Sequence, residues 1–220
     1  MMESRRYQKT KVLLNGIRNI AVQTYRHLRV PFIQKEHGDK SFIYLKNHLP
    51  YLIHPYNSTY KNERCVEVPI FSDILEGYDL ADVLEVGNVL NHYGTYWHDV
   101  LDKYEDHKAV NLKTDLLDFD SNCHYEIAIA ISTLEHIGMN DGNKPEDFLK
   151  AIKKMQFLAD EVIFSVPLRQ NFFVDKCLFQ NKLKGFKITY YYQKGFLDWQ
   201  QTSFPFIRKG IVVAICRWKK

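Results

Sequence analysis

The chain has 220 residues, 45% of them hydrophobic, and carries a formal net charge of +4. This length and composition predict one folded domain with a sizeable core and exclude a disordered chain. The charge neither requires nor excludes a nucleic-acid partner, because proteins that bind nucleic acid usually concentrate Lys and Arg on one face. The basic residues gather mainly near the two ends of the chain, where we expect them to be solvated: Arg5, Arg6, Lys9, Lys11, Arg217, Lys219 and Lys220.

The cysteine pattern and the hydropathy favour a cytoplasmic protein. The four cysteines are widely spaced and include no C-x-x-C pair, so neither a zinc site nor a disulfide framework is expected. No apolar run approaches the ~18 residues that a membrane span needs, and no signal peptide is expected.

Residues 1–60 are expected to form an N-terminal extension that begins with a helix. Its apolar positions recur near helical spacing, and Arg18, Arg26 and Arg29 lie between them. Two interpretations stay open: a helix packed on the domain, or a basic amphipathic helix on an anionic membrane surface. The apolar positions are Val12, Leu13, Ile17, Ile20, Ala21, Thr24 and Leu28.

Residues 31–60 form a loop-rich segment that is dense in tyrosine and histidine. Such side chains line the mouths of ligand sites, but they also form small clusters packed beneath loops, and both interpretations stay open. Downstream, Pro69 predicts the first turn of a helix that ends at Gly77. Arg64 either presents its guanidinium to a ligand or pairs with Glu67. The aromatic and histidine positions are Tyr44, His48, Tyr51, His54, Tyr56 and Tyr60.

The stretch 81–94, ADVLEVGNVLNHYG, is the one around which the domain is organised. Its apolar start predicts a strand over residues 81–86, with Glu85 at the carboxyl end. Gly87 follows at once, and a short helix is expected near residues 88–96. A buried strand that leads through a glycine turn into a helix presents backbone N–H groups to an anionic ligand.

Strands and helices alternate through the rest of the domain, residues 61–220. The pattern predicts strands over 98–102, 109–112, 125–132 and 161–166, and helices over 145–158 and 172–183. Two final strands, 186–192 and 211–218, flank a loop that holds Trp199 and Pro205. This order predicts an α/β fold with a doubly wound, mainly parallel seven-stranded sheet and a closing antiparallel hairpin. Ligands of such sheets bind at the carboxyl ends of the strands.

The residues at those strand ends resemble the motifs of the class I S-adenosylmethionine-dependent methyltransferases, over residues 60 to about 218. The segment Leu84–Asn88 looks like the family's first motif, although Val89 and Asn91 stand where glycines are usual. The segment Asp115–Phe119 looks like the acidic stretch after the third strand. The segment Ser132–Ile137 looks like the motif that borders the methyl-transfer site. The resemblance implies a Rossmann-like methyltransferase fold with S-adenosylmethionine as the cofactor.

The resemblance also assigns roles to individual residues. Gly87 and Asn88 would approach the methionine part of the cofactor. Asp102 would hold the ribose hydroxyls, with Glu105 as a neighbouring alternative. Asp115 and Leu116 would flank the adenine. Arg64, Glu85 and Ser132 complete the expected cofactor site.

The chemistry of methyl transfer points to a base beside the fourth strand. The enzyme mainly aligns the acceptor with the methyl group, and a base helps when the acceptor is a hydroxyl. His136 and Glu135 are the candidate catalytic residues, and packing at a helix start is the alternative role for this pair. A Glu-His pair also occurs in metal-dependent RNA 2′-O-methyltransferases, but Ser132 stands where a further Glu ligand is wanted, so no metal is expected.

The predicted function is therefore methyl transfer to a small polar acceptor, a hydroxyl of a sugar or related metabolite. An RNA methyltransferase and a catalytically inactive Rossmann-like binding module are the alternatives. A nicotinamide dehydrogenase is disfavoured, because Val89 interrupts the required G-x-G-x-x-G pattern.

Overall fold

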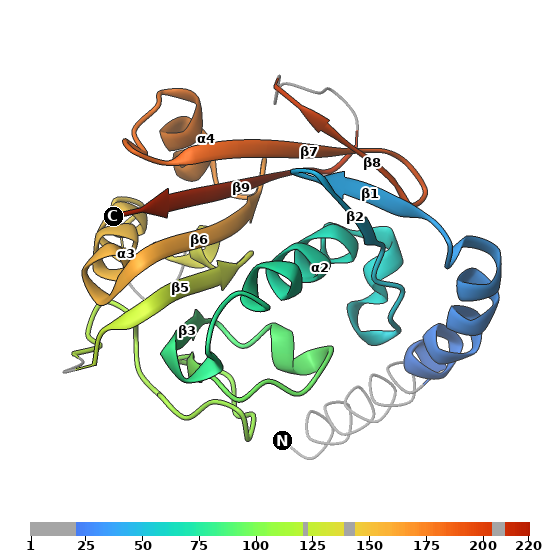
Figure 1. Cartoon of the computed structure of the whole chain (residues 1–220), viewed down its shortest axis with the longest axis horizontal. Coiled ribbons are helices and arrows are strands. Elements are labelled where there is room, and N and C mark those ends of the chain that lie inside the picture. The colour runs from blue at the N-terminus through green and yellow to red at the C-terminus, as the bar shows by residue number, and fades with distance from the viewer. Residues whose placement is uncertain (1–20, 121–122, 139–143, 204–209) are drawn as a thin grey trace, which may run out of the picture.

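The structure of the chain is a computed structural model that describes residues 21–120, 123–138, 144–203 and 210–220. A seven-stranded sheet lies at its centre (Figure 1). In sheet order the strands are β4 (Asp99–Leu101), β3 (Val83–Val86), β5 (Tyr125–Ile131), β6 (Ala159–Pro167), β9 (Val212–Lys219), β7 (Lys187–Gly195) and β8 (Asp198–Thr202). Strands β4, β3, β5 and β6 pair in parallel, and β9 lies antiparallel between β6 and β7. The expected mainly parallel seven-stranded sheet is confirmed, and so is its closing antiparallel hairpin, which β7 and β9 form.

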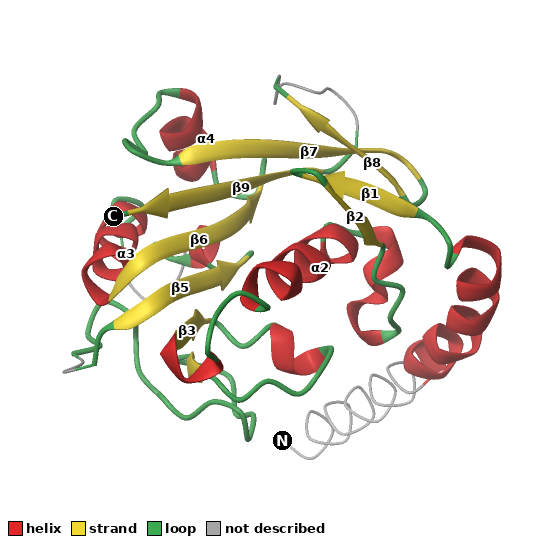
Figure 2. Ribbon diagram, viewed as in Figure 1, coloured by secondary structure: helices red, strands yellow, loops and turns green. Residues whose placement is uncertain are grey.

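Helices cover both faces of this sheet (Figure 2), as a doubly wound fold requires. They are α2 (Arg64–Leu75) on one face, and α3 (Asp147–Leu158) and α4 (Phe172–Phe179) on the other. The alternation of side chains along β5 explains the two layers. Ile127 and Ile129 pack into the core that contains α2, whereas Ala128 and Ala130 pack into the core that contains α3. Both α3 and α4 are shorter than expected, because α3 begins at residue 147 and α4 ends at residue 179.

Two segments differ from the strands expected for the sheet. The stretch 109–112 is not a strand: it makes only a single parallel bridge, between Leu112 and Leu101 of β4. Conversely, residues 198–202 form the edge strand β8 in place of part of the expected loop, because Trp199 turns inward and is buried beside α2.

Residues 41–50 form a β-hairpin in the segment that was expected to be loop-rich. Its strands β1 (Ser41–Tyr44) and β2 (Asn47–Pro50) pair antiparallel. Phe42 and Tyr44 are buried in alternation with exposed neighbours and join the core around α2. The hydroxyl of Tyr191 in β7 donates to the carbonyl of Ile43 at 3.1 Å. The hairpin thus shares a core with the domain, and the expected boundary at residue 60 stays a prediction.

Helix α2 begins at Arg64, so Pro69 lies inside it and not in its first turn as expected. A proline has no N–H for the helical bond to the carbonyl four residues before it. That carbonyl, of Cys65, instead accepts the N–H of Leu52 at 3.0 Å. The proline therefore frees an acceptor that ties the preceding segment to α2, and its cost to the helix is partly offset.

A helix occupies residues 21–37 and continues past Pro31, where the sequence suggested a loop. It buries Ile33, while Ala21, Thr24 and Leu28 of the expected apolar face are exposed. The other expected apolar positions, Val12, Leu13, Ile17 and Ile20, lie outside the described residues. Within the described part of the chain, no helix combines the length and the hydropathy needed to cross a bilayer.

The expected helix over 88–96 is replaced by a short 3-10 turn, η3 (Leu90–His92). The carboxylate of Glu85 accepts the N–H groups of Val89 and Leu90 at 2.9 and 3.0 Å. The side chain thus satisfies backbone donors that a longer helix would leave free at its start. The chain then reaches β4 at residue 99 without a further helical turn.

Candidate functional site

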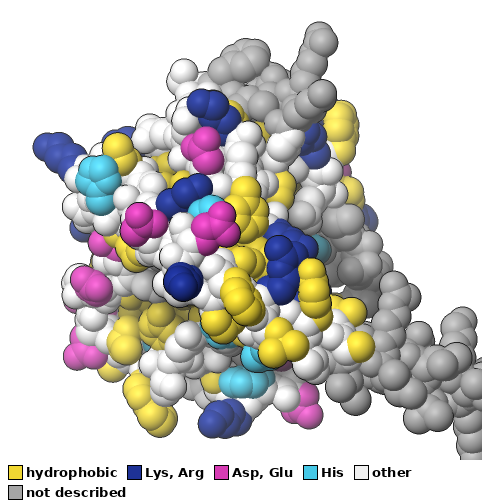
Figure 3. Space-filling view, turned by 90° about the vertical axis from the view of Figure 1, so that its right-hand side faces the viewer, with side chains coloured by type: hydrophobic (Ala, Val, Ile, Leu, Met, Phe, Trp, Pro, Cys, Tyr) yellow, Lys and Arg dark blue, Asp and Glu magenta, His cyan; other side chains and the backbone are white. Residues whose placement is uncertain are grey.

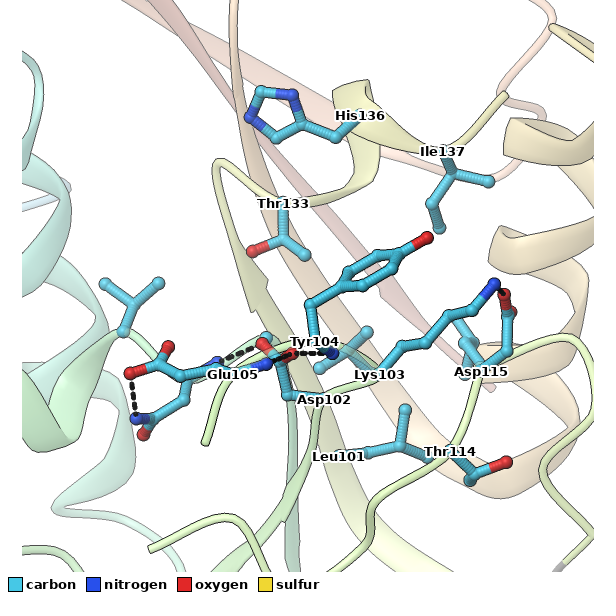
Figure 4. A pocket seen from close by; sticks show the side chains of 15 residues that line it. Leu101, Asp102, Lys103, Tyr104, Glu105, Thr114, Asp115, Thr133, His136 and Ile137 are labelled. Carbon is cyan, nitrogen blue, oxygen red and sulfur yellow. Dashed lines mark hydrogen bonds and ion pairs between the residues drawn. The ribbon is translucent and has the colours of Figure 1, made fainter. Parts of the chain in front are cut away.

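A pocket of about 580 Å³ opens at the carboxyl ends of β3, β4 and β5 (Figure 4). This is the edge at which open α/β sheets bind ligands. Six residues predicted for the site line it: Gly87, Asn88, Asp102, Asp115, Leu116 and His136. The predicted residues Arg64, Glu85, Ser132 and Glu135 do not line it. The pocket therefore separates the candidates into residues that line it and residues that do not.

Gly87 forms the sharp turn at the end of β3. Its φ is +83°, in the region that favours glycine, and its N–H donates to the carbonyl of Leu101 at 2.8 Å. A Cβ at this position would lie 2.7 Å from Cγ2 of Thr133 and closer still to its Oγ1. The glycine is thus required by the protein's own packing, and it brings the turn after β3 against the loop after β5.

Glu85 is fully buried behind this turn. In addition to the two N–H groups of η3, its carboxylate contacts Nε2 of His98 at 2.7 Å, and both side chains are buried. The carboxylate oxygens are thus occupied by groups of the protein itself. Glu85 therefore shapes the turn from behind, and the geometry favours this role over direct contact with a ligand.

Asp102 follows β4 and faces the pocket. Its Oδ1 accepts the N–H groups of Tyr104 and Glu105, both at 2.8 Å, and its Oδ2 accepts the N–H of Asn88 at 3.3 Å. A carboxylate has about four acceptor positions. Three are used here, so Asp102 offers a ligand one position, on Oδ2.

Glu105 lies beside Asp102 and supplies a second acceptor. Its Oε1 accepts Nδ2 of Asn88 at 3.1 Å and contacts Nε2 of His92 at 2.8 Å. Its Oε2 makes no hydrogen bond to the described residues. A pair of ligand hydroxyls would therefore find two acceptors on two neighbouring side chains. Asp102 and its neighbour Glu105 thus both stay candidates for the expected contact to the ribose hydroxyls.

Asp115 stands at the opposite end of the pocket from Glu105 (Figure 4). Its Oδ1 accepts the N–H of Leu117 at 2.9 Å, and its Oδ2 pairs with Nζ of Lys103 at 3.2 Å. Leu116 beside it is buried and lines the same wall. An amine donor of a ligand would have to share Asp115 with Lys103.

Several lining residues were not singled out from the sequence. The ring of Tyr104 extends between Thr133 and Ile137 in the pocket (Figure 4), and Tyr104 is 66% exposed. An exposed aromatic ring on a pocket wall is suited to stack on a flat ligand. Its position two residues after the predicted acid is the signal that could have identified it. Lys103 and Thr114 also line the pocket.

Beneath the loop after β5, Arg64 and Ser132 belong to a buried polar network. Arg64 pairs with Glu67, as the structural alternative anticipated, and its Nη2 lies 3.5 Å from the carbonyl of Ser132. Oγ of Ser132 donates to Oε1 of Glu67 at 2.5 Å. Ser132 has a φ of +40°, a conformation that costs on the order of 1–3 kcal/mol for a non-glycine residue. The network holds this strained residue and so fixes the start of the loop that carries Thr133 and His136.

His136 and Glu135 are neighbours on η4 (Leu134–His136) but face different surroundings. The His136 side chain is 61% exposed at the pocket wall, whereas Glu135 is 1% exposed. Partial burial, and then the charge of Arg64, lower the pKa of His136, so the imidazole is neutral at pH 7. Burial raises the pKa of Glu135 to about 8. At neutral pH the His136 imidazole is thus unprotonated and can act as a base, whereas the Glu135 carboxyl group keeps its proton.

The tyrosine- and histidine-rich segment divides between the two interpretations. Tyr44, Tyr51 and Tyr60 are buried in the core around α2. Tyr56, by contrast, stacks on His92 with ring centroids 4.3 Å apart and is 41% exposed. His92 in turn contacts the pocket residue Glu105. One part of the segment therefore belongs to the core, and another lies next to the pocket.

In the part of the chain that the structure describes, no group of three or more His, Cys, Asp or Glu side chains is arranged to hold a metal ion. Glu135 and His136 have no further carboxylate or imidazole ligand grouped with them there.

No protein-family model matches the chain, and no curated protein matches it. The solved structures that it resembles include the N-methyltransferase NodS from Bradyrhizobium japonicum WM9 in complex with S-adenosyl-L-homocysteine, at 11% identity over 73% of this chain and 94% of that chain, with a TM-score of 0.43. A SAM-dependent O-methyltransferase from Thermotoga maritima has 8% identity over 73% of this chain and 67% of that chain, with a TM-score of 0.40. The tRNA (m1A58) methyltransferase TrmI from Aquifex aeolicus has 11% identity over 69% of this chain and 68% of that chain, with a TM-score of 0.36. At these identities and TM-scores the likenesses assign no activity to this chain.

Proposed function

We propose that this chain is an S-adenosylmethionine-dependent methyltransferase whose cofactor site is the pocket at the carboxyl ends of β3, β4 and β5. The observation that carries the proposal is that three separately predicted positions line this one pocket: the glycine turn at Gly87, the acid at Asp102 and the acid at Asp115. The cofactor would supply an activated methyl group on a sulfonium.

The residues present fit such a cofactor. Oδ2 of Asp102 and Oε2 of Glu105 are acceptors for the two ribose hydroxyls. Asp115 and Leu116 would flank the adenine, and Tyr104 would stack on it. Gly87 and Asn88, which line the pocket at the turn after β3, would approach the methionine part of the cofactor.

The acceptor side of the site is proposed to lie around His136. The imidazole is exposed at the pocket wall and neutral at pH 7, so it can take the proton that an acceptor hydroxyl loses as the new C–O bond forms. The cluster of Tyr56, His92 and Tyr93 next to Glu105 supplies polar aromatic edges for a small polar acceptor. These features support a hydroxyl of a sugar or related metabolite as the acceptor.

Titration calorimetry with S-adenosylmethionine tests the cofactor site. We expect Asp102→Ala and Glu105→Ala each to weaken binding by roughly 10- to 100-fold, the worth of one hydrogen bond to a charged group. Asp106→Ala is the matched control, because Asp106 is exposed and does not line the pocket. Absence of binding by the unmodified chain would refute the proposal. Binding without methylation of any hydroxyl acceptor would favour the inactive binding module.

A further inference from the structure

The helix of residues 21–37 exposes a stripe of large apolar side chains. Val22, Tyr25, Leu28 and Phe32 are 40%, 55%, 64% and 75% exposed, although they recur every three or four residues on one face. Ile33, on the neighbouring face, is 5% exposed and anchors the helix to the domain. The helix is thus held by one face while a second apolar face stays open to solvent.

Basic side chains accompany this stripe. Arg26, Arg29 and Lys35 lie on the same helix, which carries the single acid Glu36. Nη1 of Arg29 donates to the hydroxyl of Tyr25 at 3.0 Å, so the cation is held over the stripe. Figure 3 shows hydrophobic and basic side chains next to one another on the face of the molecule toward which this helix lies.

The charge of the chain is concentrated in the same segment. Residues 1–37 contain eight Lys and Arg and two Glu, a net charge of 8 − 2 = +6. The whole chain contains 30 Lys and Arg and 26 Asp and Glu, so residues 38–220 carry 22 − 24 = −2. All of the excess positive charge therefore precedes or lies on the helix with the exposed stripe. A partner of this face must be negatively charged and must also accept aliphatic and aromatic side chains.

We propose that residues 21–37 form a helix that docks on an anionic phospholipid surface, with Tyr25, Leu28 and Phe32 inserted among the lipid chains and Arg26 and Arg29 at the headgroups. An apolar face bordered by Lys and Arg is the pattern of interfacial helices. A nucleic acid would complement the positive charge of this segment, but it would not bury the exposed apolar side chains Val22 and Leu28. A second copy of the chain offers an apolar surface but repeats the positive charge.

Docking would place the membrane close to the candidate site. His27 lies near His54, whose pKa is lowered by burial and further by the charge of His27. His54 packs edge-on against Tyr93 with ring centroids 5.3 Å apart, and Tyr93 contacts Tyr56 beside the pocket. The helix therefore borders the aromatic side of the site.

Sedimentation of the full chain with phospholipid vesicles tests the proposal without reference to cofactor binding. We expect binding to phosphatidylcholine vesicles that contain about 30% phosphatidylserine, and binding at least about tenfold weaker to phosphatidylcholine alone. Leu28→Ser/Phe32→Ser should lose roughly a hundredfold in affinity, since both side chains would otherwise be buried in lipid. Arg26→Gln/Arg29→Gln should lose about tenfold, on the anionic vesicles only.

Leu45→Ser/Phe157→Ser is the matched control. These residues are 56% and 70% exposed and lie outside the helix, so this variant should sediment like the unmodified chain. All variants should keep the unmodified melting temperature, because the replaced apolar side chains are exposed. The proposal is overturned if the unmodified chain stays in the supernatant at low salt, or if Leu28→Ser/Phe32→Ser sediments equally well. It is also overturned if the chain binds a single-stranded RNA probe, or forms a dimer that this variant abolishes, without binding vesicles.

Discussion

Glu135 carries an ionisable group in surroundings that disfavour its charge. Its side chain is 1% exposed, and its Oε2 has no hydrogen-bond partner among the described residues. Burial is the main cause that raises the pKa of Glu135 to about 8, and the carboxylate of Glu67 adds to it, against the attraction of Arg64. The folded protein therefore keeps a proton on this carboxyl group at neutral pH.

The consequence for stability follows from the difference between the folded and the unfolded chain. In the unfolded chain Glu135 ionises near its usual pKa of about 4.3. The favourable contribution of the protonated group is complete below that pKa and is lost as the pH rises toward 8, because unfolding then releases a proton. At ~1.36 kcal/mol for each pH unit, the free energy of unfolding should fall by about 3 kcal/mol between about pH 5.5 and 7.5.

Urea denaturation of the unmodified chain and of Glu135→Gln, at a series of pH values, measures this effect. Glutamine does not titrate, so the variant should gain about 3 kcal/mol over the unmodified chain across the same interval. Glu63, whose pKa is also raised by burial and then by Glu67, is present in both proteins and largely cancels in the difference. Glu126→Gln, at an exposed position of β5, should follow the unmodified chain. A constant difference between the unmodified chain and Glu135→Gln would show that Glu135 is ionised in the folded protein.

Three further predictions concern the pocket itself. Gly87→Ala should lower the free energy of unfolding by about 2–4 kcal/mol in urea denaturation, through its φ of +83° and its clash with Thr133. Gly87→Ala/Thr133→Ala should recover the steric part, and no recovery would contradict the proposed contact. Tyr104→Ala should weaken S-adenosylmethionine binding by about tenfold in calorimetry, with unchanged stability because the ring is exposed. The methylation rate should rise with pH and level off, with its midpoint below the usual histidine pKa of about 6.5, because the pKa of His136 is lowered. The rate of His136→Gln should be about a hundredfold lower and should not show this rise with pH.

The parallel centre of the sheet could be predicted because its strands are buried on both faces. The stretches 125–132 and 161–166 are almost continuous in apolar residues, and such runs leave few alternatives to a covered strand. The order of these strands then brought Gly87, Asp102 and Asp115 to one edge. Position along the chain was sufficient here, because carboxyl ends of parallel strands meet at the same side of a sheet.

The helix expected over 88–96 and the hairpin at 41–50 depended on contacts that the sequence does not record. Glu85 accepts the N–H groups of Val89 and Leu90 with its own side chain, and this caps the start of η3 without adding a further helical turn. In the hairpin, Phe42 and Tyr44 alternate inward, but Asn47 and Pro50 in the second strand are poor strand formers. Burial against α2 and β7 outweighs that local preference.

The sequence does not show which way an acid at a strand end faces. Glu85 and Asp102 both lie at strand ends. The carboxylate oxygens of Glu85 are occupied by two backbone N–H groups and by His98, whereas Asp102 keeps one acceptor position toward the pocket. Similarly, the buried Glu135 side chain keeps its proton at neutral pH, whereas the exposed His136 side chain is neutral. The residue type at a strand end thus predicts only that an acid is present. The number of its acceptor positions that remain after the backbone has been satisfied decides whether that acid can bind a ligand.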